Sequence, residues 1–450
     1  MNAPANRYSL EFIQSMLTEK SGRVSGWFKE LELRSVYQPI YSLPHKRVIG
    51  FDASLRGSDP GGKPVSAGSL FGPVENYSET YLLDLLCATI HLHNFFSGQP
   101  CRSLLFIKLH PEVLLDSEPT AEFLASLCRH YSVPEHRLVI DVPASILHEA
   151  KAAAASEAYR RAGCLIAVNN FGVDNSNLDT ISEIEPTAVR MARAVVADAA
   201  RDHRAQQMLR RALSMLHEAG KLIEMEGVES EGEALAAIDA DADLASGYYF
   251  GRHCEDPRHF EANGAMERLW AIYKGRHADK TREEATERAS LENELLRSSV
   301  KGKLGAASPA EISRYRGKRR PFLVALQRVT AQLQSGTDFE SACAGFLALP
   351  GAIRFYMLDG EGWQIGIDVM SAHPPARQGV DLNELVSTLA ADWSRRDFFL
   401  RARREPGIVQ VSRPYCSAFG YTRCVTFSVA IQLNRDSAVI CGDVDWSLHA

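Results

Sequence analysis

Short apolar runs alternate with amphipathic stretches between about residue 34 and residue 253. Seven of the runs have the length and composition of buried strands, at residues 35–43, 47–55, 103–110, 137–144, 164–170, 188–192 and 221–227. Stretches with helical periodicity lie between several of them, for example at 79–96 and 205–220. Alternating strands and helices favour a parallel sheet, and a span of about 220 residues suits one closed (β/α) barrel better than an open sheet.

The pattern changes beyond this span. Residues 262–314 are charge-rich and helical in composition, with few large apolar side chains. They predict a connecting helix, or a dimer-forming helix if the sparse leucines pair. Ser308 and Pro309 are placed to cap and start a further helix. A helix at 319–334 follows, and then come strand-like runs at 352–359, 363–370, 408–415, 423–433 and 438–446.

The order of these strand-like and helical segments predicts that the chain has three parts. We expect an α/β, TIM-like (β/α) barrel over residues 1–261, a charged helical linker over 262–314, and a smaller α+β domain with an antiparallel sheet over 315–450. A chain of 450 residues with 45% hydrophobic and 24% charged residues is typical of soluble globular proteins. Its net charge of −6 gives no argument for a nucleic-acid or membrane partner.

Targeting signals and cysteine usage point to the cytoplasm. The first residues lack the apolar segment of a signal peptide, and no apolar run approaches the length that spans a bilayer. The nine cysteines are scattered, without a CxxC pair or a Cys/His cluster. We therefore expect free thiols in a reducing compartment and no zinc site.

Candidate chemistry lies at the end of the run 164–170, which closes with two adjacent amides, Asn169 and Asn170. Residues at the C-terminal ends of barrel strands carry the chemistry in this kind of fold. An amide donates and accepts hydrogen bonds, but it cannot act as a base or supply the charge that binds a divalent cation. The pair therefore raises the question of whether this strand end is an active site or the remains of one.

Residues 37–253 resemble the EAL family, the bacterial barrel domains that linearise cyclic di-GMP. Seven motifs occur in the family's order: YQPIYSLPHKRVIGFDASLR (family E-A-x-L-R), LLFIKLHPEVL (asparagine before Ser-Pro), LVIDVPAS (E-x-T-E), IAVNNFG (Asp-Asp-Phe-Gly), VRMAR (K-I-D), EMEGVES (E-G-V-E) and SGYYFGRH (Q-G-Y-x-F-G-R-P). The resemblance covers about 220 residues and implies a barrel whose relatives hydrolyse the nucleotide with two metal ions.

The departures from the family pattern concentrate on positions that the resemblance assigns to the metal site. Two glutamates are shortened to Asp52 and Asp141, a third is replaced by Ala144, and the two bridging aspartates are replaced by Asn169 and Asn170. Three other groups are exchanged: Lys108 replaces Asn, Arg190 replaces Lys, and Ser246 replaces Gln. Glu226 alone among the metal-site acids is unchanged.

These changes predict the loss of metals and of phosphodiesterase activity. Two divalent cations need several carboxylates to offset their charge, and a metal-bound water becomes a nucleophile only while the metal is held. A unit positive charge about 4 Å from a dication costs roughly 8 kcal/mol at an effective dielectric near 20. We expect Lys108 to occupy the vacated site and to pair with Asp52, Asp141 or Glu226, with no Mg²⁺ and no other cofactor bound.

Positions that the family uses to bind nucleotide are retained, namely Gln38, Leu55, Arg56, Asp84, Glu229 and Phe250. By the resemblance, Arg56 would contact a phosphate, Asp84 would accept from a guanine edge, and Phe250 or Tyr249 could stack on a base. Alternatively, these residues could have purely structural roles. Gln38 and Asp84 could be ordinary groups of the barrel rim, and Arg56 could pair with Glu75 or Glu79.

Residues 315–450 resemble the PAS-like Cache/PDC sensor fold. The resemblance implies that Arg395, Arg396, Tyr415, Arg423 and Asp443 lie where such domains contact small carboxylate-bearing ligands. The family's aspartate in PY-x-D is Ser417 here. A dimerisation or docking module without a ligand is therefore favoured over a sensor.

The sequence thus predicts a cytoplasmic, catalytically inactive EAL-type signalling protein. The leading hypothesis is a receptor that binds cyclic di-GMP without hydrolysing it. A second hypothesis is a regulator that binds a partner protein independently of nucleotide, and a third is a weak phosphodiesterase. The family resemblance also implies a homodimer.

Overall fold

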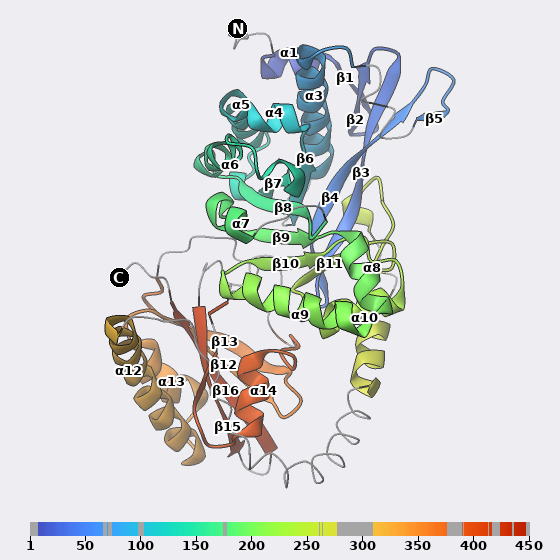
Figure 1. The fold of residues 1–450 in the computed structure, drawn as a ribbon. Coiled ribbons are helices and arrows are strands. Elements are labelled where there is room, and N and C mark those ends of the chain that lie inside the picture. The colour runs from blue at the N-terminus through green and yellow to red at the C-terminus, as the bar shows by residue number, and fades with distance from the viewer. Residues whose placement is uncertain are drawn as a thin grey trace. The chain divides into compact units, whose positions relative to one another are not determined.

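The structure, a computed structural model, describes residues 8–65, 70, 74–97, 103–173, 178–260, 262, 264–276, 309–375, 389, 391–412, 414–415, 424–433 and 436–446. The chain forms two compact units, one built on residues up to 263 and one on most of residues 264–450 (Figure 1). Among the residues that the structure describes, every helix is too short or too polar to span a bilayer.

The first unit contains a closed eight-stranded barrel (Figure 1). Its strands are β3 (Leu31–Ser42), β4 (Arg47–Ser58), β6 (Leu104–Lys108), β7 (Leu138–Pro143), β8 (Leu165–Phe171), β9 (Ala188–Met191), β10 (Leu222–Met225) and β11 (Leu244–Ser246). The strands from β4 to β11 pair in parallel, and β3 closes the barrel by pairing antiparallel with both β4 and β11. The predicted barrel is confirmed, although β3 runs against the expected parallel direction and the short β11 was not among the predicted strands.

Helices and additional strands surround the barrel. The strands β1 (Leu17–Lys20) and β2 (Arg23–Phe28) extend β3, and β5 (Pro64–Val65) pairs with β4. The helices are α1 (Leu10–Ser15), α3 (Tyr77–Phe96), α4 (Pro111–Leu115), α5 (Ser117–His130), α6 (Ala152–Arg161), α7 (Leu178–Ile184), α8 (Arg193–Arg201), α9 (His203–Glu218) and α10 (Glu231–Asp239). Short 3-10 turns occupy Glu135–Arg137, Ala144–Ile146 and Pro257–His259.

Local sequence accounts for where several helices begin. Helix α10 starts with a capping box, in which the Ser230 side chain accepts from the Glu233 amide and the Glu233 carboxylate reaches back to the Ser230 amide. Asn76 caps α3 by accepting from the Glu79 amide, and Asp202 caps α9 by accepting from the amides of Arg204 and Ala205. These caps satisfy amides that have no partner inside the helix, so each helix starts at a defined residue.

The barrel interior consists of an apolar layer followed by a polar one. Side chains from the eight strands form the apolar layer: Ile40, Ile49, Leu104, Phe106, Val139, Ala167, Ala188, Leu222 and Leu244. Side chains of a strand alternate between its two faces, so the inward positions two residues further on belong to the next layer. Those positions hold Lys108, Asp141, Asn169, Arg190, Glu224 and Ser246. The period of two therefore places the polar residues together at the C-terminal end of the strands.

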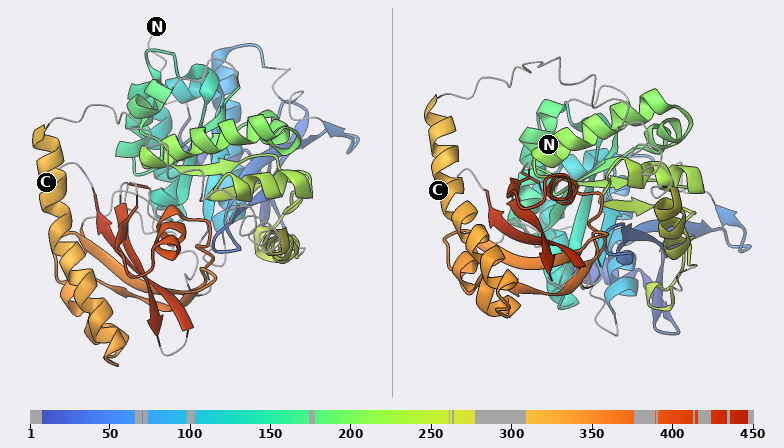
Figure 2. Two further views of the ribbon diagram at one scale, coloured as in Figure 1. Left: turned by 60° about the horizontal axis from the view of Figure 1, so that its bottom comes forward. Right: turned by 90° about the horizontal axis from the view of Figure 1, so that it is seen from below.

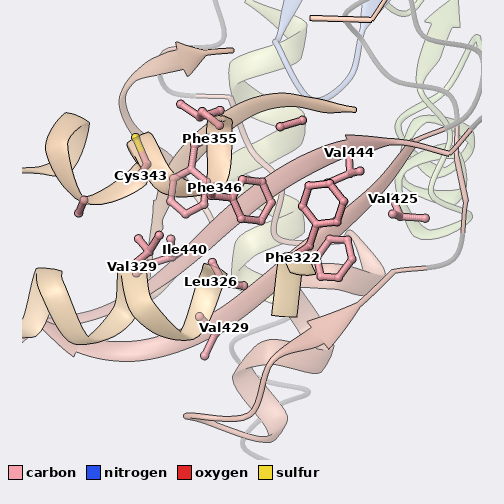
Figure 3. Close-up of a cluster of buried hydrophobic side chains, with 14 of the residues drawn as sticks. Phe322, Leu326, Val329, Cys343, Phe346, Phe355, Val425, Val429, Ile440 and Val444 are labelled. Atoms are coloured by element: carbon pink, nitrogen blue, oxygen red, sulfur yellow. The ribbon is translucent and has the colours of Figure 1, made fainter. Parts of the chain in front are cut away.

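The second unit contains a five-stranded antiparallel sheet in the order β13 (Gln364–Met370), β12 (Ala352–Asp359), β16 (Asp436–Asp445), β15 (Cys424–Leu433) and β14 (Gln410–Val411) (Figure 2). Helices α12 (Pro309–Gln334) and α13 (Phe339–Leu347) cover one face. There Phe346 packs between Phe322, Phe355 and Phe427 (Figure 3). Helix α14 (Asp397–Arg404) lies on the other face, where the Ser428 hydroxyl donates to the Phe398 carbonyl. The predicted α+β arrangement is present.

Part of the predicted linker belongs to the second unit. Residues 265–276 are helical, and the Lys274 ammonium lies 3.6 Å from the centre of the Trp363 ring. The Arg395 guanidinium likewise lies 5.3 Å from the Trp270 ring. Cation–π contacts of this kind hold the helix to the C-terminal unit. Residues 277–308, including Ser308, lie outside the described residues, and α12 begins at Pro309 as predicted.

Candidate functional site

A buried arginine lies at the centre of the polar layer. Arg190 of β9 has no exposed surface, and its Nη1 donates to Asp52 Oδ1 at 3.0 Å while its Nη2 donates to Glu224 Oε1 at 3.1 Å. The same guanidinium is ion-paired with Asp141. Three carboxylates from β4, β7 and β10 therefore surround one guanidinium, whose forked donors can serve several oxygens at once.

Strand register brings these groups to one level. Arg190 and Glu224 are direct partners in the β9–β10 ladder, so their side chains leave adjacent strands at the same height. Asp52 is the ladder partner of Phe106, whose ring lies 5.2 Å from the guanidinium carbon. Asp141 is the partner of Lys108 on β6. The closed barrel turns five separate sequence motifs into one cluster.

A second cation lies further out. Lys108 Nζ is 3.3 Å from Glu226 Oε1, and Glu226 is in turn 3.5 Å from Arg190 Nη2. The Lys108 side chain is 46% exposed, whereas the Arg190 side chain is fully buried. Glu226 thus connects the buried guanidinium to an ammonium at the mouth of the barrel.

Short polar side chains complete the cluster. Asn169 Nδ2 donates to Asp141 Oδ2 at 3.4 Å, and the Ser246 hydroxyl donates to Glu224 Oε1 at 2.7 Å. Asn170 is exposed and has a φ of 54°, a left-handed conformation that asparagine tolerates better than most residues. The two adjacent amides therefore differ in role, since only Asn169 bonds to the carboxylate cluster.

The carboxylates differ in their protonation. Burial raises the pKa of Asp141 to about 6 and that of Glu224 to about 7, against the opposing effect of Arg190. Burial also acts to raise the pKa of Asp52, but the charges of Arg190 and Lys108 hold it below its ordinary value. The pKa of Lys108 is raised, chiefly by Asp52, so the ammonium stays charged at neutral pH. At neutral pH the two cations therefore face an ionised Asp52, whereas Glu224 is only partly ionised.

The expectation for Lys108 was wrong in one respect. Lys108 pairs with Glu226 as predicted, but Arg190 fills the centre that we assigned to Lys108. The two cations differ in burial, because the Arg190 side chain is fully buried whereas the Lys108 side chain is 46% exposed. Glu224 was missed entirely. A charged residue two positions after the inward-facing Leu222 was the signal that could have identified it.

This set of residues does not fit a pair of divalent metals. Oxygens of Asp52, Asp141 and Glu224 already accept from Arg190 or pair with it. A dication about 4 Å from that guanidinium would be repelled by roughly 8 kcal/mol at an effective dielectric near 20. Within the described residues, no group of three or more His, Cys, Asp or Glu side chains is arranged to hold a metal ion. Ala144, in the turn that follows β7, supplies no ligand.

The predicted nucleotide residues lie around the same barrel mouth. Gln38 is half-buried and donates to the Gly251 carbonyl at 3.2 Å, and it is the ladder partner of Asp52. Arg56 is exposed, and its Nη1 donates to the carbonyl of Leu55, which is itself buried. Glu75 and Glu79, the alternative partners of Arg56, instead lie 3.6 and 3.0 Å from the ammonium of Lys29.

The remaining predicted binding residues are engaged within the protein. Asp84 is buried on α3 and accepts from the His110 amide at 2.6 Å, and burial raises its pKa to about 7. Glu229 is ion-paired with Arg193. Phe250 is fully buried, so its ring offers no face for stacking on a base. In the same motif Tyr248 is 47% exposed.

The C-terminal candidates are dispersed. Asp443 is fully buried and accepts from Arg354 Nε at 2.6 Å and from the Thr426 hydroxyl at 2.7 Å. Arg354 also donates to Asp368 at 2.8 Å. Arg395 contacts Trp270, Arg396 stands at the N-cap position of α14 without a capping bond from its side chain, and Tyr415 is half-buried. Arg423 and Ser417 lie outside the described residues. Asp443 therefore belongs to a buried ion-pair network on the α14 face of the sheet.

The family follows from a match to residues 23–253, about half of the chain, by the model of the EAL domain. The chain belongs to the EAL-domain family. The buried Arg190 cluster thus lies inside an EAL domain, at the C-terminal end of its barrel strands.

Several characterised proteins share this domain. Cyclic di-GMP phosphodiesterase RocR of Pseudomonas aeruginosa is 22% identical over 272 residues, which cover 54% of this chain and 68% of RocR. The YkuI protein of Bacillus subtilis, solved with cyclic di-GMP and calcium, is 19% identical with a TM-score of 0.48, over 92% of this chain and 96% of YkuI. The EAL domain of FimX from Pseudomonas aeruginosa, solved with cyclic di-GMP, is 18% identical with a TM-score of 0.45, over 50% of this chain and 91% of that domain.

Proposed function

We propose that this EAL domain is a receptor that binds cyclic di-GMP without hydrolysing it. The observation that carries the proposal is the fully buried Arg190 guanidinium among Asp52, Asp141 and Glu224. Family membership supports the choice of nucleotide, since RocR, a relative, is a cyclic di-GMP phosphodiesterase.

The case against hydrolysis rests on charge. In the family, as the resemblance implies, two metals activate water, and the acids that bridge them are Asn169 and Asn170 here. Amides supply no charge, and the carboxylates that remain nearby already have a cationic partner. Because no metal-bound water is then available as a nucleophile, we expect the nucleotide to dock and to leave unchanged.

The case for binding rests on groups that still face solvent. Arg56 is exposed on β4, and its forked guanidinium suits a phosphodiester. Tyr248 exposes an aromatic face in the segment that follows β11. Gln38 lies between these two segments, through its bond to Gly251. These groups surround the barrel mouth, which is where ligands bind in this architecture.

Equilibrium binding of fluorescently labelled cyclic di-GMP tests the proposal, with one series in EDTA and one in Mg²⁺ or Mn²⁺. We expect micromolar or tighter binding that is the same in both series and is abolished by Arg56→Ala. Arg47→Ala is the matched control, because Arg47 is an exposed arginine at the opposite end of the same strand.

Two results would contradict the proposal in different ways. Conversion of the nucleotide to its linear form by the wild-type chain would overturn the absence of hydrolysis. No binding at several hundred micromolar would overturn the receptor and favour the regulator that acts through a protein partner alone.

For the second unit, we infer a dimerisation or docking role in the cytoplasm rather than ligand sensing. The support is that Asp443, a candidate ligand residue, is committed to Arg354 and Thr426. Sedimentation velocity of the full chain should then give a homodimer. A monomer at tens of micromolar would contradict the dimerisation role.

A further inference from the structure

We propose that Lys108 and His253 join Arg56 in binding a phosphodiester group of the nucleotide, so that a built-in cationic cluster replaces divalent metal in phosphate recognition. The inference rests on the proposed function and extends it to two residues that the family resemblance does not assign to binding.

Backbone pairing places His253 at the barrel mouth. The adjacent residue Cys254 exchanges two backbone hydrogen bonds with Tyr37 of β3, at 2.8 and 2.9 Å. Tyr37 and Gln38 are the ladder partners of Ala53 and Asp52 on β4, the strand that carries Arg56. The segment that holds His253 therefore runs beside the strand pair β3–β4 at the level of the polar layer.

The surroundings of His253 leave it partly accessible. Its ring packs edge-on against Tyr248, with centroids 5.8 Å apart, and Tyr248 is itself 47% exposed. Burial lowers the pKa of His253, and the positive charges of Arg56 and Lys108 lower it further. The carboxylate of Asp52 acts to raise this pKa. At neutral pH the imidazole is therefore a hydrogen-bond donor to an anion rather than a fixed charge.

Lys108 is the outward cation of the cluster. It is the last residue of β6 and lies two positions beyond Phe106, the ladder partner of Asp52. Its side chain is 46% exposed, and among the described residues it pairs with the carboxylate of Glu226 at 3.3 Å. Two of the three ammonium protons can therefore turn to a ligand without breaking the pair with Glu226.

Arg190 makes anion binding feasible at this position. Asp52, Asp141, Glu224 and Glu226 would otherwise present four carboxylates to an incoming phosphodiester and repel it. The guanidinium is within ion-pairing distance of all four and is fully buried, so it offsets one of their negative charges from inside. The raised pKa values of Asp141 and Glu224 reduce the remaining negative charge. In a metal-dependent site, bound cations perform that neutralisation. Here the chain supplies both the internal cation and the outward ones.

The test measures binding of labelled cyclic di-GMP in EDTA to the full chain and to Lys108→Gln, His253→Ala and Lys108→Arg. We expect Lys108→Gln to weaken binding at least tenfold and His253→Ala about three- to tenfold, while Lys108→Arg keeps affinity within about threefold because it keeps the charge. Arg47→Gln, at the far end of β4, should leave affinity unchanged. Circular dichroism checks that each variant is folded, and His253→Ala tests the inference independently if Lys108→Gln misfolds.

The outcomes separate this inference from the proposed function. If the wild-type chain binds in EDTA but Lys108→Gln and His253→Ala both bind within twofold of it, the cationic cluster is refuted and the receptor stands. If the wild-type chain binds only when Mg²⁺ or Mn²⁺ is added, metal recognition persists and the inference is also refuted. If the wild-type chain does not bind with or without metal, both proposals fall.

Discussion

Replacing Arg190 with methionine isolates the effect of the buried guanidinium. Methionine has a similar length but no charge, so Asp52, Asp141 and Glu224 lose their shared donor while the packing volume is largely kept. Removing one partner of a buried ion pair usually costs about 3–5 kcal/mol, because the other charge stays buried without compensation. Here three carboxylates are affected at once.

Protonation limits the loss. A carboxyl with an unfolded pKa near 4 can be neutralised at pH 7 for roughly 4 kcal/mol, and at pH 5 for about 1.4 kcal/mol. Glu224 and Asp141 already have raised pKa values, so the main loss is the ionised state of Asp52. We therefore expect Arg190→Met to lower the free energy of unfolding of the barrel by about 4–6 kcal/mol at pH 7 and by about 2 kcal/mol at pH 5.

The direction with pH follows from the change at Asp52. In the wild type its lowered pKa contributes stability above its unfolded pKa, and this stability is lost only as pH falls through the folded value. Without Arg190, burial raises the Asp52 pKa above its unfolded value. Stability is then greatest at low pH and is lost as pH rises from about 4 through the new folded pKa.

Urea unfolding at pH 5, 6, 7 and 8, followed by circular dichroism and by hydrogen exchange of β9 and β10, measures the effect. Four of the five tryptophans lie in the second unit, so fluorescence follows mainly that unit and should be unchanged. Arg193→Met is the matched control, since Arg193 forms an exposed pair with Glu229 and should contribute less than about 1 kcal/mol. A loss below about 1 kcal/mol for Arg190→Met, or a loss that is equal at pH 5 and pH 8, would refute the reasoning.

Three further predictions concern other parts of the chain. Asp84→Asn should stabilise the barrel relative to wild type by an amount that grows from pH 4 to pH 8 and reaches about 4 kcal/mol in urea unfolding. The reason is that the pKa of Asp84 is raised to about 7, so its ionised form is unfavourable in the folded barrel. A difference that does not change with pH would contradict this. The double variant Asn169→Asp, Asn170→Asp should still give no linear dinucleotide in Mn²⁺ by chromatography, because Arg190 remains at the centre; turnover would show that the guanidinium yields to metal. Phe346→Ala should lower the unfolding free energy of the second unit by about 3–5 kcal/mol by tryptophan fluorescence, and a loss under 1 kcal/mol would mean that the core collapses around the gap.

Much of the fold could be predicted because its signals are local. The seven predicted strands of the barrel and the five strand-like runs of the second domain all correspond to observed strands, since buried strands need continuous apolar or alternating residues. Strand β11 escaped prediction because three residues carry almost no periodicity. The antiparallel direction of β3 was also missed. The residues of a strand do not show whether it pairs antiparallel with the next strand in a hairpin or joins a parallel sheet through a crossover.

The candidate site was predicted in part. The loss of acids at Asn169 and Asn170 could be inferred from residue types at matching positions, as could the pairing of Lys108 with one of Asp52, Asp141 or Glu226, of which the structure shows Glu226. The role of Glu224 could not be inferred in that way, because it lies just before the family's E-G-V-E pattern, which begins at Glu226. Inward side chains from distant strands meet only in the closed barrel, so identifying the partners needs the heights of all eight strands together.

By itself, the sequence determined the two kinds of sheet and the replacement of charged metal ligands by amides, since periodicity and residue identity are properties of single positions and their near neighbours. Only the tertiary structure decided that Arg190, rather than Lys108, lies among the carboxylates. It also decided that Asp84 is held by the His110 amide. Both outcomes depend on ladder register across a closed barrel and on which groups lose water together, and these are relations between distant residues that no local pattern encodes.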